Sequence, residues 1–255
     1  MPVAPPPTAS KYYATSALAA TAASRAAVAA RPQGIRAAWL SIARFQVAQA
    51  VLAPRAVDKM LAEQDIDIPP LAALNPTAFA TTLETFEQMV AEFTEEWELE
   101  RLAESLVQDA GRAAQGVSVA SRPRVSHVRH LNLPSCSRCA VLAGRVYRFS
   151  EGFQRHPGCD CVMIPVTLAS PDLTYDPVEL AREGQVTGLS KADLRAVTDG
   201  ADFNKVANVR QRRAGLTESG RVLNRAGKPT PEAVYRLAND REEAVALLKQ
   251  AGYLR

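Results

Sequence analysis

The placement of the cysteines constrains the fold of this chain more than any other feature of its sequence. All four cysteines of the 255 residues lie in one short window, as Cys136-x2-Cys139 followed by His156-x2-Cys159-x-Cys161. Zinc binds four thiolate or imidazole ligands in a tetrahedron, and two short pairs separated by a small β-like insert can supply them from two turns. The spacing therefore predicts a structural zinc site that holds together a unit poor in large apolar residues.

The window offers five candidate ligands for four positions. An all-thiolate site uses the four cysteines, whereas a mixed site replaces either Cys159 or Cys161 by His156. The alternatives to a metal are two disulfides or reduced thiols that merely cluster. A bond within Cys159-x-Cys161 would be strained, so disulfides would have to cross between the two pairs.

The N-terminal sequence favours a reducing compartment. The first ten residues, MPVAPPPTAS, lack the early positive charge of a signal peptide. The Ala-rich run between Lys11 and Arg25 is too short and too weakly apolar to predict a membrane span. We therefore expect assembly in a cytoplasm, where disulfides are rare.

Enzymatic interpretations of the window find less support. A catalytic zinc needs an open position beside a base such as Glu151 or Asp160, and four or five ligands leave none. A deaminase requires an upstream H-x-E, and a thioredoxin-like site requires a βαβ context; the sequence shows neither. A protease built on Ser126, His127 or His130 is the remaining enzymatic alternative, but two histidines on a short strand explain the pattern more simply.

Charge is unevenly distributed along the chain. The net charge of +3 is too small for a protein that coats nucleic acid. Counted by segment, however, residues 1–60 carry +6, residues 61–108 carry −10 and residues 109–161 carry +5. We interpret the acidic segment as a solvated face that contacts its basic neighbours or a basic partner.

The N-terminal half reads as helical. Four prolines predict a flexible arm over residues 1–10, and helical patterns follow over residues 11–30 and 35–52. Pro54 and the IDIPP run that ends at Pro70 interrupt this pattern. A further helix is predicted to start at Asn75-Pro76 and to carry one apolar stripe. The stripe comprises Phe79, Leu83, Phe86, Val90, Phe93 and Trp97.

The pattern changes after Gly111 and Gly116. Short strands are predicted at RPRVSHVRHLNLP, VYRF and CVMIPV, and a capping box at Ser190 and Asp193 predicts a helix that Gly200 ends. Another helix is predicted from Thr230 to just before Gly252. The expected fold is α+β and predominantly α, with a helical domain at 11–115, a Cys/His core at 116–170 and a small helical region at 171–255.

A resemblance to a known family rests on the same window. The run C-x2-C-x-x-L-x-G-x-x-Y, followed by H-P-x-C-x-C and a short apolar strand, resembles the core of the Mu F-like minor capsid, or head morphogenesis, proteins of tailed bacteriophages. Residues 188–216 and 230–255 also resemble versions from phages of actinobacteria. The matching core residues are Cys136, Cys139, Leu142, Gly144, Tyr147, His156, Pro157, Cys159 and Cys161.

The resemblance implies a structural protein of the virion. Such proteins lie inside the capsid in few copies and associate with the portal protein and other capsid components, with no membrane and no small-molecule substrate. Related genes are often labelled capsid maturation (prohead) proteases. A maturation protease is therefore the alternative to a purely structural role. A third possibility is a virion-internal DNA-binding protein, in which Arg210, Arg212 and Arg213 contact packaged DNA or a partner instead of forming solvated surface.

Overall fold

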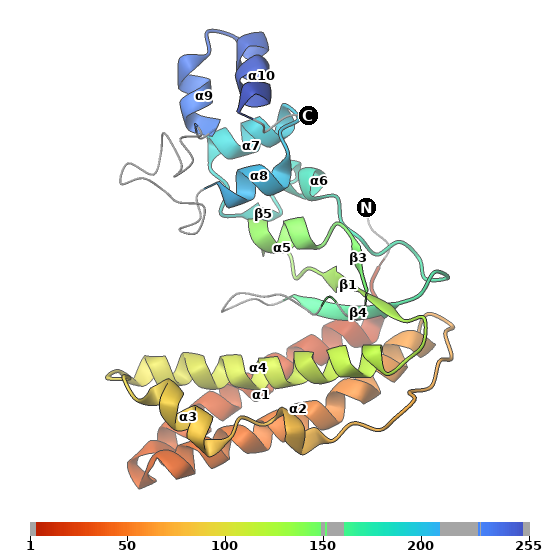
Figure 1. The fold of residues 1–255 in the computed structure, drawn as a ribbon, viewed down its shortest axis with the longest axis vertical. Helices are drawn as coiled ribbons and strands as arrows, with labels where there is room; N and C mark the ends of the chain where they lie inside the picture. The colour runs from red at the N-terminus through yellow and green to blue at the C-terminus, as the bar shows by residue number, and fades with distance from the viewer. Residues whose placement is uncertain (1–3, 149–150, 152–160, 210–228, 230, 252–255) are drawn as a thin grey trace. The chain divides into compact units, whose positions relative to one another are not determined.

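The computed structural model describes residues 4–148, 151, 161–209, 229 and 231–251. The fold is α+β and mainly α, which confirms the expected fold class at this level (Figure 1). The chain forms two compact units. The first unit comprises Met1–His130 and Val146–Leu173, and the second comprises Leu131–Arg145 and Thr174–Arg255.

Three long helices form the body of the first unit. They are α1 (Pro7–Ala30), α2 (Ile35–Ala62) and α4 (Glu96–Ala120), and each contacts the other two. A 3₁₀ turn, η1 (Arg31–Gln33), and Gly34 with φ of 108° connect α1 to α2. Ala20, Ala23 and Ala38 are buried where the helices meet, because small side chains let helix backbones approach closely.

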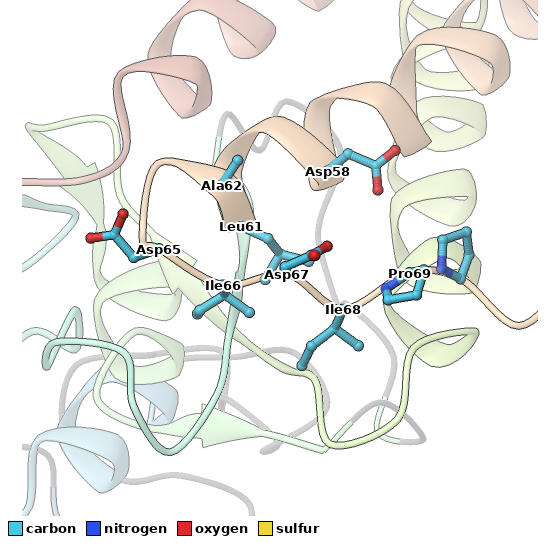
Figure 2. Close-up of a pocket in the computed structure, with 9 residues that line it drawn as sticks. Asp58, Leu61, Ala62, Asp65, Ile66, Asp67, Ile68 and Pro69 are labelled. Atoms are coloured by element: carbon cyan, nitrogen blue, oxygen red, sulfur yellow. The ribbon is translucent and has the colours of Figure 1, made fainter.

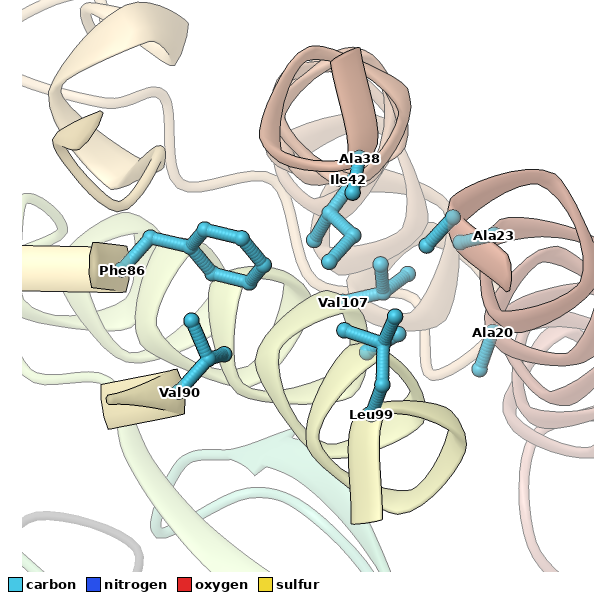
Figure 3. Packing of buried hydrophobic residues seen from close by; sticks show 10 residues of the cluster. Ala20, Ala23, Ala38, Ile42, Phe86, Val90, Leu99 and Val107 are labelled. Atoms are coloured by element: carbon cyan, nitrogen blue, oxygen red, sulfur yellow. The ribbon is translucent and has the colours of Figure 1, made fainter. Parts of the chain in front are cut away.

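A short helix closes one end of this bundle. It is α3 (Leu83–Val90), preceded by the 3₁₀ turn η2 (Pro76–Phe79). Figure 3 shows Phe86 and Val90 of α3 beside Leu99 of α4, within one apolar cluster that also includes Ile42 of α2. Burying such side chains removes apolar surface from water and is the main stabilising contribution to the bundle.

The prediction of a single helix from Asn75 is wrong, because the structure has three separate elements there, η2, α3 and α4. Thr82 begins α3, where its side chain accepts a hydrogen bond from the Thr85 amide, and Glu95 begins α4 with Glu98 as its capping-box partner. Each cap satisfies amides that a continuous helix would satisfy internally, so the chain can turn at both points. The predicted stripe is therefore split, and its last member, Trp97, is 52% exposed.

Two prolines behave differently from the sequence-based expectation. Helix α1 begins at Pro7, inside the predicted arm, because proline fits the first helical position and the Glu63 carboxylate accepts from the Thr8 amide (3.0 Å) and hydroxyl (2.6 Å). Pro54 lies inside α2 and does not end it. The neighbouring Val57 is buried in the bundle, and such packing offsets the lost backbone hydrogen bond.

Helix α4 also continues through both glycines at which a change of pattern was predicted. Gly111 lies at a close helix crossing, where an added Cβ would be 2.8 Å from the Tyr12 hydroxyl and 3.4 Å from the Gln49 carboxamide oxygen. Gly116 has more room, since its nearest neighbour would be the Met163 methyl at 3.8 Å. The first glycine therefore reflects packing and not the end of a helix.

A small antiparallel sheet completes the first unit. Its order is β3 (Val146–Tyr147), β1 (Ser126–His130) and β4 (Val162–Val166), and these three strands confirm the sequence prediction. Val128 of β1 pairs with Ile164 of β4. Both side chains pack with Ala56 and Met60 of α2, so this face of the sheet covers the bundle.

The second unit is built from short elements. The parallel pair β2 (Ser135–Cys136) and β5 (Val186–Thr187) accompanies the helices α5 (Ser137–Leu142), α6 (Pro177–Arg182), α7 (Lys191–Thr198), α8 (Phe203–Asn208), α9 (Pro231–Leu237) and α10 (Arg241–Gln250). The predicted capping box of Ser190 and Asp193 opens α7 and is confirmed. The helix predicted over 230–252 is two helices, because Asp240 caps a second start by accepting from the Glu243 amide at 2.8 Å.

Candidate metal centre

The first predicted ligand pair occupies one tight turn of the second unit. Cys136 ends strand β2 and is the N-cap residue of α5, with φ of −70° and ψ of 152°. Its sulfur accepts a hydrogen bond from the Cys139 amide at 3.4 Å. The two cysteines are therefore brought together by a local fold in which residue 136 is extended and residues 137–139 are helical.

The same turn buries the second cysteine of the pair. Cys139 is 2% exposed, and Ala140 beside it is fully buried. Pairing with Thr187 of β5 fixes the backbone of Cys136 from the other side. The Cys136 and Cys139 pair is thus held between strand β5 on one side and helix α5 on the other.

The described residues do not bring the remaining predicted ligands together with Cys136 and Cys139. Cys161 precedes β4 in the first unit, is 1% exposed, and its carbonyl accepts from the Arg112 guanidinium at 3.5 Å. His156 and Cys159 lie outside the described residues. Among the residues that the structure describes, no group of three or more His, Cys, Asp or Glu is placed to hold a metal ion.

The donor set nevertheless fits zinc at the one pair that can be tested. Cys136 and Cys139 supply two soft donors at the spacing that structural zinc sites use, and the amide-to-sulfur hydrogen bond is the kind of outer interaction that supports such ligands. A bound zinc ion would stabilise the loops that carry its ligands. The choice of four ligands among the five candidates stays a prediction.

The two histidines considered for hydrolytic chemistry both lie on β1. His127 is 2% exposed and stacks on Tyr147 of β3, with ring centroids 5.3 Å apart and planes inclined by 14°. Burial lowers the pKa of His130 below its usual value. Ser126 pairs with Val166 at the far end of the same strand. Both histidines therefore lie on the predicted short strand, and His127 is buried and not at the surface.

The predicted acidic face is exposed as expected on α3 and the start of α4, at Glu84, Glu87, Glu92, Glu95 and Glu96. Glu98 differs, since its carboxylate accepts from the Thr94 and Glu95 amides at 2.9 and 3.0 Å and so caps α4. The candidate DNA-contact residues Arg210, Arg212 and Arg213 lie outside the described residues.

One hollow of the first unit was not identified from the sequence. A groove of about 610 Å³ lies beside the end of α2 and the run that follows it (Figure 2). Its lining includes Asp58, Asp65 and Asp67 together with Leu61 and the prolines at 69 and 70. The sequence interpretation treated the IDIPP run only as an interruption of the helix.

Comparisons with known proteins add no identification. No protein-family model, no curated protein and no solved structure matches this chain. Within the described parts of the chain, no helix is both long and apolar enough to cross a membrane.

Proposed function

We propose that this chain is an architectural minor capsid protein of a tailed bacteriophage, similar to the Mu F-like head morphogenesis proteins. It acts inside the capsid, is assembled in the host cytoplasm, and binds the portal protein and other capsid components. The observation that carries the proposal is the Cys136-x2-Cys139 and His156-x2-Cys159-x-Cys161 pattern, supported by the turn in which the Cys136 sulfur accepts from the Cys139 amide.

The proposed role is mechanical and not chemical. A structural zinc held by four of the five residues Cys136, Cys139, His156, Cys159 and Cys161 keeps the small core folded, and the helices offer surface to partners. The acidic surface on α3 and α4 is a candidate contact for a basic partner. Packaged DNA is a further candidate partner, through Arg210, Arg212 and Arg213.

The metal part of the proposal is tested by elemental analysis of protein purified without added zinc. We expect about one zinc per chain in the wild type and in Arg138→Gln, which changes an exposed residue within the same turn. Cys136→Ser should lose zinc and the order of the second unit. A wild-type protein that is folded with only a trace of metal would refute the zinc site.

The functional part is tested in the virion. Mass spectrometry of purified procapsids and mature particles should detect the chain at a few copies per particle. Co-expression with the portal protein of the same phage should give a complex that co-elutes on size exclusion. Absence from both kinds of particle, together with no portal complex, would remove the proposal.

The two alternatives predict different outcomes with the same purified protein. A maturation protease would cleave the capsid or scaffold protein of its phage, and His127→Ala or substitution of one serine would abolish the cleavage. A DNA-binding protein would associate with duplex DNA with an affinity that falls steeply as salt is raised. The architectural proposal expects neither cleavage nor a requirement for DNA in portal binding.

A further inference from the structure

The outward face of α2 carries a ridge of cations and apolar side chains. Residues four apart on a helix form such ridges, which pack into the grooves of partner helices. Positions 36, 40, 44, 48 and 52, continued by 55 and 59, are all exposed, and together they run about 35 Å along the helix. We call these residues the basic ridge: Arg36, Leu40, Arg44, Ala48, Leu52, Arg55 and Lys59.

The side chains of the basic ridge are available to a partner. Its arginines and its lysine form no side-chain hydrogen bond or ion pair in the described part of the chain. Leu40 and Leu52 are 46% and 37% exposed, whereas Leu61 of the same helix is 2% exposed. Both exposed leucines would stay in water if the ridge bound only DNA phosphates, so the pattern favours a protein surface that offers carboxylates around apolar groups.

The same chain carries a surface of this complementary kind on α3 and the start of α4. Its glutamates are exposed and form no ion pair with any residue that the structure describes. Two large apolar side chains of the segment, Met89 and Trp97, are 42% and 52% exposed, and the Arg101 guanidinium lies over the Trp97 ring. We call these residues the acidic surface: Glu84, Glu87, Met89, Glu92, Glu96 and Trp97.

A hollow beside the acidic surface can receive an apolar side chain. It has a volume of about 220 Å³ and lies at the end of α1, the end of α3 and the start of α4. Val90, Phe93 and Leu99 supply its apolar lining, and Glu96 and Arg31 also line it. Side chains that fill such pockets commonly contribute most of the binding energy of an interface. A leucine of the basic ridge is an anchor of the matching kind.

We propose that copies of this chain bind one another head to tail, with the basic ridge of one copy on the acidic surface of the next. Within one chain the two surfaces form no ion pair among the described residues. Between copies, the +6 of residues 1–60 meets the −10 of residues 61–108, and Leu40 or Leu52 enters the hollow. The ridge is long enough for an interface of standard size, which buries about 800 Å² on each partner.

This contact is heterologous, so each end of the assembly keeps one surface open and the copies form a ring or a chain. The inference names a partner for the acidic surface. It depends on the exposed charges and not on the zinc site or the phage assignment, so its failure and theirs are separate results.

The first test is sedimentation equilibrium of the full chain. In about 50 mM salt, the weight-average mass of the wild type should rise above that of one chain between about 5 and 200 μM, and about 500 mM salt should weaken this association at least about fivefold. A ridge variant, Arg36→Glu with Arg44→Glu, and a surface variant, Glu87→Gln with Glu92→Gln, should each weaken it at least about fivefold. Unchanged thermal melts would show that each variant folds.

Mixing the two variants tests the head-to-tail arrangement. The surface variant keeps an intact basic ridge, and the ridge variant keeps an intact acidic surface. An equimolar mixture should therefore form a one-to-one dimer and nothing larger. The matched control, Arg182→Glu with Lys191→Glu, makes the same charge reversal at exposed sites of the second unit and should change association less than about twofold.

A second readout uses the wild type alone. Wild-type chains labelled with heavy nitrogen are mixed with unlabelled chains and treated with a carbodiimide, which joins lysine to nearby carboxylates. Mass spectrometry should find Lys59 joined to Glu84, Glu87 or Glu92 between a labelled and an unlabelled chain. The proposal is overturned by a wild type that stays monomeric up to about 200 μM in low salt. Equal weakening by the control, no dimer in the mixture, or a monomeric wild type whose ridge binds duplex DNA or anionic vesicles would also overturn it.

Discussion

The close crossing at Gly111 gives the sharpest test of how the helical bundle packs. A Cβ built on Gly111 would be 2.8 Å from the Tyr12 hydroxyl oxygen, which is shorter than real Cβ contacts, and 3.5 Å from the Gln49 Cβ. The Tyr12 hydroxyl is buried and has no hydrogen-bond partner among the described residues. A methyl group at position 111 therefore has to displace the hydroxyl end of a half-buried Tyr12 ring, which packs against Ala50 and Ala53 of α2 and Ala114 of α4.

The magnitude follows from two opposing terms. Overpacking a well-packed core costs about 1–3 kcal/mol. Replacing a glycine inside a helix by alanine contributes about 1 kcal/mol of helix propensity. Gly111→Ala should therefore be neutral to about 2 kcal/mol less stable. Gly116→Ala receives the same propensity gain, but its Cβ would meet only the Met163 methyl at 3.8 Å, so it should be about 0.5–1 kcal/mol more stable.

The difference between the two variants isolates the packing term, because both lie in α4 and share the propensity gain. We expect Gly111→Ala to be about 1–3 kcal/mol less stable than Gly116→Ala in urea unfolding followed by circular dichroism at 222 nm. Adding Tyr12→Phe to Gly111→Ala removes the atom at 2.8 Å and should restore most of the loss. A Gly111→Ala protein as stable as Gly116→Ala would refute the close crossing.

The other predictions concern single contacts of the first unit. Asp58→Asn should lower the free energy of unfolding by about 1–2 kcal/mol, because it leaves the buried Arg122 guanidinium with only neutral acceptors. We expect a value near about 1 kcal/mol, since the Asp58 side chain is 56% exposed and water screens the ion pair. Equal stability of Asp58→Asn and wild type in urea would contradict it. Glu63→Gln should cost about 0.5–1.5 kcal/mol by weakening the cap on Thr8, and faster amide exchange at the start of α1 is the expected sign. Burial lowers the pKa of His130, so the unfolded chain binds the proton more readily, and stability should fall as pH drops below about 6.5. His130→Leu should flatten this part of the stability profile, and an unchanged slope between pH 7 and 5 would contradict the assignment.

Alkaline pH should act on the same bundle through Tyr12. Burial raises the pKa of Tyr12, with a smaller opposing effect of the Arg112 charge. The folded state therefore keeps the phenol protonated where the unfolded chain loses the proton, and stability should decline as pH rises above about 10. Tyr12→Phe should remove this decline in urea unfolding at pH 9 to 11, and an equally steep decline in the variant would show that another group is responsible.

Features that depend on neighbouring residues were the ones that could be predicted from the sequence. The capping box of Ser190 and Asp193 needs only a three-residue spacing, and the structure has it. The three strands of the first unit were similarly visible as short apolar runs. The spacing of Phe79, Phe86 and Trp97 was misleading because a 3-4 repeat says nothing about where caps interrupt a helix. Thr82 and Glu95 interrupt it here.

Features that depend on distant segments could not be predicted. Pro54 was taken as a break because its cost is local, whereas the packing that offsets it comes from other helices. Gly111 was taken as a change of pattern for the same reason, since the ring that requires a glycine belongs to Tyr12, about a hundred positions earlier. Glu63 capping Thr8 likewise joins two helices that no short motif connects.

The candidate zinc site shows where this limit lies within one motif. The Cys136 and Cys139 half is local, so a two-residue spacing predicts the turn, and the amide-to-sulfur hydrogen bond is present in it. Whether that half meets His156, Cys159 and Cys161 depends on how distant segments fold together. The spacing in the sequence gives only the number and type of the possible metal ligands. A bound metal would supply the missing constraint, because a tetrahedral ion fixes the relative positions of its ligands. Without the metal, the loops would need buried apolar area to offset the entropy lost when they are ordered. Zinc removal should therefore loosen the turn of Cys136 and Cys139 in the second unit, and the start of β4 next to Cys161 in the first unit, far more than the three-helix bundle, whose apolar cluster contains none of the predicted ligands. Chelation that also unfolds the three-helix bundle, or that changes neither segment, would contradict this prediction.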